Sequence, residues 1–229
     1  MRILAIDTAL DLCSVAFVTA TGRGPALSEP LARGHAERLF AMVEAVLAED
    51  GAKLEDADRI AVTIGPGSFT GIRIGLAAAR GFALALGRPV IGVDTLEALA
   101  ASAAERPSGP VFAAIDARKG EVYAAVYDRG AEAVAPFAAD VAAALDRVPH
   151  DCGLVIGSGA PLLAHAATVA GRRLPPLEPL AGPDIRKVAA IAAARAPAVR
   201  PPAPLYLRAP DAKPQAGRMA HLFAVEAAS

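Results

Sequence analysis

A strand-like run that leads directly into a glycine-rich turn and then into an apolar helix is the feature that most limits how this chain can fold. Residues 59–64 are rich in β-branched side chains, and residues 65–71 read Gly-Pro-Gly-Ser-Phe-Thr-Gly. Residues 72–86 have a helical pattern that ends at a Gly-Arg-Pro sequence. A strand, a glycine turn and a helix in this order indicate an α/β protein.

The composition is typical of an ordered globular chain. Of its 229 residues, 54% are hydrophobic and 21% are charged, and the formal net charge is -1. Disordered chains combine low hydrophobicity with high net charge, so disorder is not expected over most of the sequence. A balanced charge also gives no basic field across the whole chain, and direct RNA binding is therefore not predicted.

The ends and the cysteines favour a reducing, cytoplasmic location. Cys13 and Cys152 are too few for a disulfide framework, and neither has the spacing of a metal ligand. Asp7 interrupts the first apolar run too early for a signal peptide, and no uncharged run is long enough to span a bilayer. A membrane partner is not expected.

The order of the patterned segments predicts two lobes, with the boundary in the turn-rich stretch 105–110. The first lobe, residues 1–104, contains the glycine turn and two apolar helices, and the smaller second lobe, residues 105–229, contains a proline-rich segment and a loosely held tail from Lys213. Strands are expected at 3–6, 13–18, 27–31, 59–64, 90–93, 111–115, 122–127 and 154–156. Helices are expected at 35–50, 72–86, 96–104, 138–145, 162–169 and 185–194.

The glycine turn is a candidate phosphate site. Gly65, Pro66 and Gly67 could let a ligand approach the backbone closely at the start of a helix. The alternative is a tight turn that packs on the next helix, and this alternative is favoured because no Lys-Ser/Thr pair follows, as it would in a P-loop.

Asp7 and Thr8 end the first strand and are a second candidate for phosphate or magnesium binding. Aspartate also caps turns through its own backbone, and this structural role is favoured unless Asp7 faces a cleft.

The histidines do not predict a metal site or a catalytic group. A helical His pair would need a second histidine four residues after His35, where the sequence has Leu39, and the other histidines are distant. A structural or capping role is favoured for His35. No nucleophile-base arrangement or acid-base pair stands out, so no catalytic residue is predicted.

The two helices of the first lobe predict a protein-protein interface. Internal burial is the ordinary explanation for such apolar helices, but two wide apolar arcs side by side could instead form a four-helix bundle with another helix pair. The predicted interface residues lie on residues 35–50 and 72–86: Leu39, Phe40, Met42, Val43, Val46, Leu47, Ile72, Arg73, Leu76 and Arg80.

Several motifs together resemble the bacterial TsaB (YeaZ) family, and they are spread over most of the chain. The match is loose over residues 131–203. The matching segments are Ile6-Asp7-Thr8-Ala9, Cys13-Ser14-Val15-Ala16, His35-Ala36-Glu37-Arg38-Leu39, residues 63–75 with the glycine turn, Asp116-Ala117-Arg118-Lys119-Gly120-Glu121-Val122-Tyr123 and Pro204-Leu205-Tyr206-Leu207-Arg208.

This resemblance implies an actin/Hsp70-like (ASKHA) two-lobed α/β fold with mixed sheet flanked by helices. It also implies a non-catalytic partner and activator of TsaD in forming threonylcarbamoyladenosine (t6A) next to the anticodon of tRNA. The implied partners are TsaD, the ATPase TsaE, a second copy when the chain is alone, and tRNA through the complex. In TsaD a histidine pair binds metal, and His35 followed by Leu39 keeps at most half of that site.

An enzyme of the same fold is the alternative hypothesis. It would be an ATP-binding transferase or a metallopeptidase, with Asp7, Thr8, Gly65 and Gly67 around the nucleotide. No cofactor is assigned, and ATP or ADP with magnesium at a partner interface is the one candidate.

Overall fold

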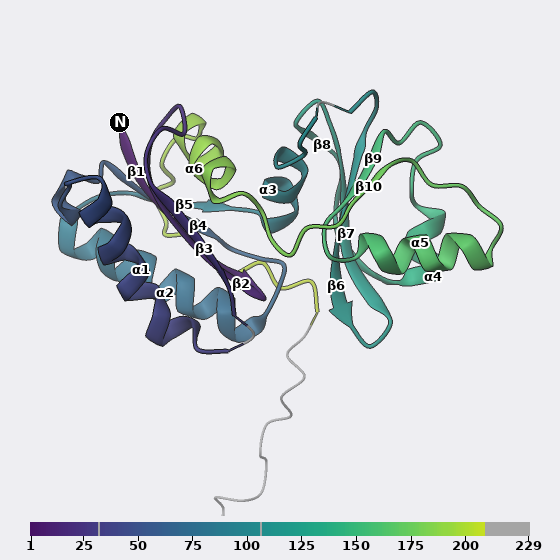
Figure 1. Ribbon diagram of the computed structural model, residues 1–229, viewed down its shortest axis with the longest axis horizontal. Helices are drawn as coiled ribbons and strands as arrows, with labels where there is room; N and C mark the ends of the chain where they lie inside the picture. The colour runs from purple at the N-terminus through teal and green to yellow at the C-terminus, as the bar shows by residue number, and fades with distance from the viewer. Residues whose placement is uncertain (32, 106, 209–229) are drawn as a thin grey trace, which may run out of the picture.

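The computed structural model describes residues 1–31, 33–105 and 107–208, and it contains two five-stranded sheets (Figure 1). The first sheet has the strand order β3-β2-β1-β4-β5. Its strands are β1 (Arg2–Leu10), β2 (Leu12–Thr19), β3 (Ala26–Pro30), β4 (Arg59–Thr63) and β5 (Val90–Val93). β1, β2 and β3 form an antiparallel meander, and β4 and β5 add parallel strands on the other side of β1.

The second sheet repeats this topology. Its order is β10-β9-β6-β7-β8, in which β6, β7 and β8 are antiparallel and β9 and β10 are parallel to β6. Its strands are β6 (Val111–Arg118), β7 (Glu121–Asp128), β8 (Ala131–Asp140), β9 (Leu154–Ile156) and β10 (Leu177–Glu178). The chain thus contains a structural duplication, which the sequence pattern does not display as a fixed-period repeat.

Helices cover the sheets in corresponding positions. The helices are α1 (His35–Glu49), α2 (Phe69–Leu86), α3 (Thr95–Ala101), α4 (Val141–Asp146), α5 (Ala160–Val169) and α6 (Ile185–Ala194), with a short 3-10 helix at Leu54–Asp56. α1 and α2 lie side by side on one face of the first sheet, and α4 and α5 pack against the second (Figure 1).

The last helix of each repeat packs against the sheet of the other repeat. α3 follows β5 of the first sheet but packs against β6 and β7 of the second, whereas α6 follows β10 of the second sheet and packs against β1 and β2 of the first. By these contacts α6 belongs with the first lobe and α3 with the second, so the predicted division at residues 104 and 105 is wrong for both helices. Sequence order alone does not place a helix that crosses back between lobes.

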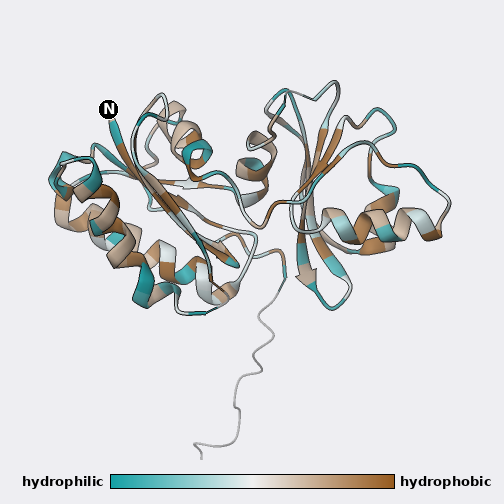
Figure 2. Cartoon of the chain, viewed as in Figure 1, coloured by the Kyte–Doolittle hydropathy of each residue, from teal (hydrophilic) through white to brown (hydrophobic). Residues whose placement is uncertain are grey.

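Residues along β1 alternate between two faces, as a strand with helices on both sides requires. Leu4 and Ile6 belong to the cluster that contains the buried stripes of α1 and α2, and Ile3 and Ala5 pack with residues of α6. Figure 2 shows hydrophobic colouring along the strands of both sheets. The first sheet is thus buried on both faces.

One further expectation changes in the second lobe. Residues 138–140, expected to begin a helix, continue β8, and α4 starts at Val141 because the Asp140 side chain accepts a hydrogen bond from the backbone N–H of Ala143 at 2.8 Å. The proline-rich segment forms neither helix nor strand, as predicted. The predicted tail from Lys213 lies outside the described residues.

Candidate functional site

The glycine turn brings the start of α2 into close contact with the end of β1. The backbone N–H of Ser68 donates to the carbonyl of Ala9 at 2.7 Å, and the Ser68 hydroxyl caps α2 by accepting from Gly71. A Cβ atom on Gly67 would lie 2.2 Å from the Ala9 carbonyl oxygen, and one on Gly71 would lie 2.0 Å from that of Thr8. These glycines therefore serve the packing of helix on strand.

Asp7 and Thr8 are buried in the same contact. One carboxylate oxygen of Asp7 accepts hydrogen bonds from the Thr63 hydroxyl at 2.6 Å and from the backbone of Ala9 at 2.9 Å. The Thr8 hydroxyl donates to the Gly71 carbonyl at 2.7 Å. Burial raises the pKa of the Asp7 carboxyl above its usual range. The hydrogen bonds from Thr63 and Ala9 and the nearby His35 act to lower this pKa.

The candidate phosphate residues are consequently not gathered around a common cavity. Asp7 has 0% and Thr8 has 1% of its surface exposed. The Gly65 backbone is covered by the C-terminal segment, since a Cβ atom there would lie 2.7 Å from the Leu205 carbonyl oxygen. Pro66 and Gly67 do line a cleft. Asp7, Thr8 and Gly65 therefore do not fit a site for nucleotide phosphate and magnesium, and the capping role favoured for Asp7 agrees with its bond to Ala9.

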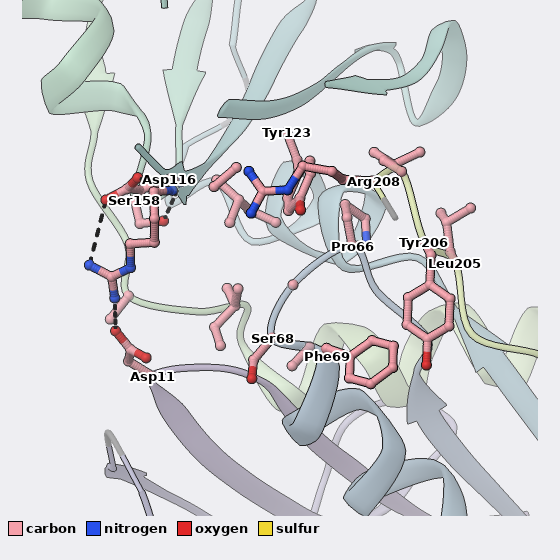
Figure 3. A pocket seen from close by; sticks show the side chains of 18 residues that line it. Asp11, Pro66, Ser68, Phe69, Asp116, Tyr123, Ser158, Leu205, Tyr206 and Arg208 are labelled. Carbon is pink, nitrogen blue, oxygen red and sulfur yellow. Dashed lines mark hydrogen bonds and ion pairs between the residues drawn. The ribbon is translucent and has the colours of Figure 1, made fainter. Parts of the chain in front are cut away.

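A cleft of about 600 Å³ separates the lobes. Figure 3 shows Asp11, Ser68 and Phe69 of the first lobe on one side, and Asp116, Tyr123 and Ser158 of the second on the other. The described residues that line it are Ala9, Leu10, Asp11, Pro66, Gly67, Ser68, Phe69, Ile115, Asp116, Ala117, Arg118, Tyr123, Ser158, Ala181, Leu205, Tyr206, Leu207 and Arg208.

Two corresponding strand turns meet at one end of this cleft. The guanidinium of Arg118, the last residue of β6, forms an ion pair at 2.6 Å with Asp11, which lies in the turn after β1. The backbone N–H of Asp116, near the end of β6, donates to the Ser158 hydroxyl at 3.1 Å, which joins β6 to the turn after β9. The Arg118-Asp11 pair is exposed, so its contribution to stability is small, but it links the lobes directly.

His35 and the two cysteines have structural surroundings. The buried His35 ring places Nε2 3.1 Å from the Leu10 carbonyl oxygen, within hydrogen-bond distance. Burial raises the pKa of the Cys13 thiol to about 11, and it also raises that of Cys152. Among the described residues, no group of three or more His, Cys, Asp or Glu side chains could hold a metal ion.

The predicted interface residues mostly face inward. Seven of them form the stripes by which α1 and α2 pack on their own sheet, and their exposed fractions are between 0% and 9%. These seven are Leu39, Met42, Val43, Val46, Leu47, Ile72 and Leu76. The prediction that these seven residues form an exposed interface is wrong, because the apolar stripe of a helical pattern is the stripe that packs against the sheet. Phe40, Arg73 and Arg80 are exposed.

The outer face of α1 and α2 has a different composition, which the apolar pattern did not identify. Phe40 is 53% exposed and Leu84 is 87% exposed, and the Phe40 ring meets that of Phe82 edge-to-face, with 5.7 Å between centroids. Seven other exposed positions of the two helices are small: Ala36, Ala41, Ala45, Ala48, Ala77, Gly81 and Ala85. We call these ten residues, with Arg73 and Arg80, the docking face. The sequence feature that indicates this face is the spacing of small residues three to four positions apart.

By length and composition alone, α2 could also span a bilayer. In the structure its apolar stripe instead packs on β1 and β4, and its outer side has Arg73 and Arg80. Helices of this kind also occur in the core of proteins without a membrane, so these two properties of α2 do not indicate a membrane protein.

Comparison with known proteins gives consistent matches. Residues 25–168 match the model of the family described as TsaD, tRNA N6-adenosine threonylcarbamoyltransferase. The tRNA threonylcarbamoyladenosine biosynthesis protein TsaB of Escherichia coli is 48% identical over 130 residues, which are 56% of this chain and 56% of that protein. The chain thus aligns with little more than half the length of this relative.

Solved structures extend the similarity to nearly the whole chain. YeaZ from Pseudomonas aeruginosa superposes with a TM-score of 0.68 and 34% identity, covering 83% of this chain and 90% of that one. A second structure, of an uncharacterized protein from the same organism with similarity to peptidase YeaZ, has a TM-score of 0.72 and 32% identity, with coverages of 90% and 99%.

A more distant match bears on the fold alone. The ethanolamine utilization protein EutJ from Carboxydothermus hydrogenoformans has a TM-score of 0.51 at 14% identity and covers 84% of this chain and 89% of that one. The predicted actin/Hsp70-like two-lobed α/β fold, with mixed sheets flanked by helices, is confirmed.

Proposed function

This chain belongs to the bacterial TsaB (YeaZ) family, and from that premise we propose that it acts in the biosynthesis of threonylcarbamoyladenosine in tRNA. The proposed role is that of a non-catalytic partner and activator of TsaD. The docking face of α1 and α2 is the observation that carries this proposal, because it has the composition of a helix-packing surface and lies on the outside of the molecule.

Small side chains make this face suitable for another helix pair. Ala41, Ala45 and Ala48 follow one another along α1, and Ala77 and Gly81 do so along α2. Alanine and glycine let helix axes approach closely, and Phe40 and Leu84 supply large apolar groups to fill the grooves of a partner. A four-helix bundle between two subunits is the arrangement that this pattern favours.

The charges on the two helices differ in sign. The exposed charges of α1 are net acidic, with Glu37, Glu44 and Glu49 beside an Arg38 that pairs with Glu29, whereas those of α2 are Arg73 and Arg80. A partner with the same arrangement could place its acidic helix against the basic one, which favours correct alignment. A second copy of this chain has such a surface, so we propose a homodimer in the absence of TsaD. TsaE is a further proposed partner, and tRNA would be reached through the complex.

Substitutions on the outer face test this role without disturbing the core. We expect Ala41→Glu and Ala77→Glu to weaken binding of purified TsaD by at least about tenfold and to abolish tRNA modification in a reconstituted system. Ala190→Glu, an exposed alanine of α6 on the opposite face of the same sheet, is the matched control and should bind TsaD normally. Charged residues at Val43 or Leu76 would instead unfold the chain, since both are buried.

Intact modification by variants that no longer bind TsaD would contradict the proposal. So would full binding by both glutamate variants, because the docking face would then have no part in the complex.

A second candidate function is an ATP-binding transferase or a metallopeptidase-like enzyme, and the cleft between the lobes is the observation in its favour. ATP or ADP with magnesium would have to be held by other lining residues, since Asp7, Thr8 and Gly65 do not fit. Calorimetry of the chain with ATP and magnesium separates the two functions. Binding together with turnover would favour the enzyme, and no heat of binding would favour the partner role.

A further inference from the structure

The segment from Pro202 to Arg208, which we call the clasp, runs along α2 and then into the second lobe. The carbonyl of Pro202 accepts a hydrogen bond from the Arg80 guanidinium at 2.6 Å. Further along, the Tyr206 hydroxyl accepts from Nε of Arg73 at 3.1 Å. Both arginines of the docking face are therefore held by this one segment.

Aromatic stacking strengthens the contact at Tyr206. Its ring lies 5.0 Å from that of Phe69, centroid to centroid, and the Arg73 guanidinium lies 3.8 Å from the centroid of the Phe69 ring. Arginine on an aromatic face and tilted aromatic pairs are both favourable arrangements. The guanidinium of Arg73 is thus fixed by a ring on one side and a hydroxyl at its Nε.

The middle of the clasp is seated on the first lobe. The backbone N–H of Leu205 donates to the Ile64 carbonyl at 2.7 Å. Gly65 and Gly92 leave room for the clasp, since a Cβ atom on Gly65 would lie 2.7 Å from the Leu205 carbonyl oxygen and one on Gly92 would lie 2.7 Å from Cβ of Pro202. Two glycines therefore make space for the same segment.

The far end of the clasp reaches the second lobe. The Arg208 guanidinium forms an ion pair with Glu121 at the start of β7, at 2.5 Å. Residues 205–208 line the cleft on the way, and Figure 3 shows Leu205, Tyr206 and Arg208 along one side of it. One continuous segment therefore connects the docking face with β7.

We propose that the clasp positions Arg73 and Arg80 for the partner and makes this positioning depend on the second lobe. The inference rests on the proposed function, because it assumes that TsaD binds the docking face. A long arginine side chain loses rotamer freedom on binding, and an arginine that is already held loses less. Carboxylates of the partner would then meet two guanidinium groups that are already oriented.

The test uses Glu121→Gln, which weakens the far anchor of the clasp without touching α1 or α2, and Tyr206→Phe, which removes the hydroxyl and keeps the ring. We expect each variant to bind purified TsaD about three- to tenfold more weakly, with the melting temperature unchanged. Asp128→Asn, at the other end of β7, is the matched control and should bind as the wild type does. Hydrogen-deuterium exchange should be faster at the Leu205 amide and the first turn of α2 in Glu121→Gln.

The outcomes separate the inference from the proposed function. If Glu121→Gln and Tyr206→Phe bind TsaD as the wild type does while Ala77→Glu does not, the clasp inference is overturned and the proposed function stands. If the wild type does not bind TsaD, the proposed function fails. In that case hydrogen-deuterium exchange of Glu121→Gln tests the clasp by itself. Unchanged exchange rates overturn the clasp inference, and faster exchange at the Leu205 amide and in the first turn of α2 supports the effect of the clasp on α2.

Discussion

The carboxyl group of Asp7 has two oxygens in unlike surroundings. One accepts two hydrogen bonds, and the other is buried and has no hydrogen-bond partner within the described residues. A buried charge without full compensation is costly, which is why the pKa of this group is raised. At this residue the sequence pattern indicated a binding site as one of two alternatives, and the burial favours the structural one.

This raised pKa has a consequence for stability. The folded state binds the proton more tightly than the unfolded chain, so the stabilisation is complete below the unfolded pKa and is lost as the pH rises through the folded one. Asp7→Asn keeps an oxygen acceptor for Thr63 and Ala9 but cannot ionise. We expect it to lose less stability than the wild type between about pH 4 and about pH 8, as measured by urea unfolding.

Asp7→Ala is the informative comparison. It leaves the Thr63 hydroxyl and the Ala9 N–H without their acceptor, and we expect a loss of about 2 kcal/mol or more at either pH. Equal pH dependence in Asp7→Asn and the wild type would contradict the account of this carboxyl group.

At the scale of elements, α2 is placed by its glycines. Gly71 faces the carbonyl of Thr8, whereas a Cβ atom on Gly81, in the same helix, would have no neighbouring atom within 4 Å. We expect Gly71→Ala to cost at least about 2 kcal/mol because the methyl group would overlap backbone. Gly81→Ala should stabilise the chain by up to about 1 kcal/mol because only helix propensity changes there.

Thermal and urea unfolding of the two variants measure this difference. Equal effects of the two substitutions would show that the α2-β1 contact is not close-packed. Gly81→Ala also adds a methyl group on the docking face, so its binding to TsaD should be measured separately from its stability.

Most elements were predictable because their burial is periodic. The strand β1 and the helix α1 have the alternation and the three-to-four spacing that one or two buried faces impose. β8 was missed because it is an edge strand whose first five residues are all exposed and which contains Pro136. Seven of the ten predicted interface residues were misassigned for a related reason: a sequence pattern shows which stripe is apolar, but not whether a sheet of the same chain covers it.

On the scale of the whole molecule, the two lobes repeat one topology and exchange their closing helices. The sequence predicted two lobes and a boundary near residue 105, and both sheets follow that order in the chain. The return of α6 to the first sheet could not be predicted, because Ile185, Val188 and Ala192 would fit any apolar sheet face equally well. Only the assembled structure distinguishes the two sheets.

Truncation tests the exchange. A chain ending at residue 104 retains all strands of the first sheet but lacks α6, so we expect it to be insoluble or unfolded by circular dichroism. A chain ending at residue 199 retains α6 and lacks only residues 200–229, which include the clasp, and we expect it to fold. Cooperative unfolding by residues 1–104 alone would contradict this view of the lobes.

The exchange of α3 and α6 also sets the order of events during synthesis. While the ribosome is still making the second half, the face of the first sheet that contains Ile3, Ala5 and Val18 has no helix to cover it. It becomes covered only when the chain has been made as far as residue 194. An apolar face of the first sheet therefore stays uncovered through most of translation, whereas α3, which packs on the second sheet, has been made before that sheet begins.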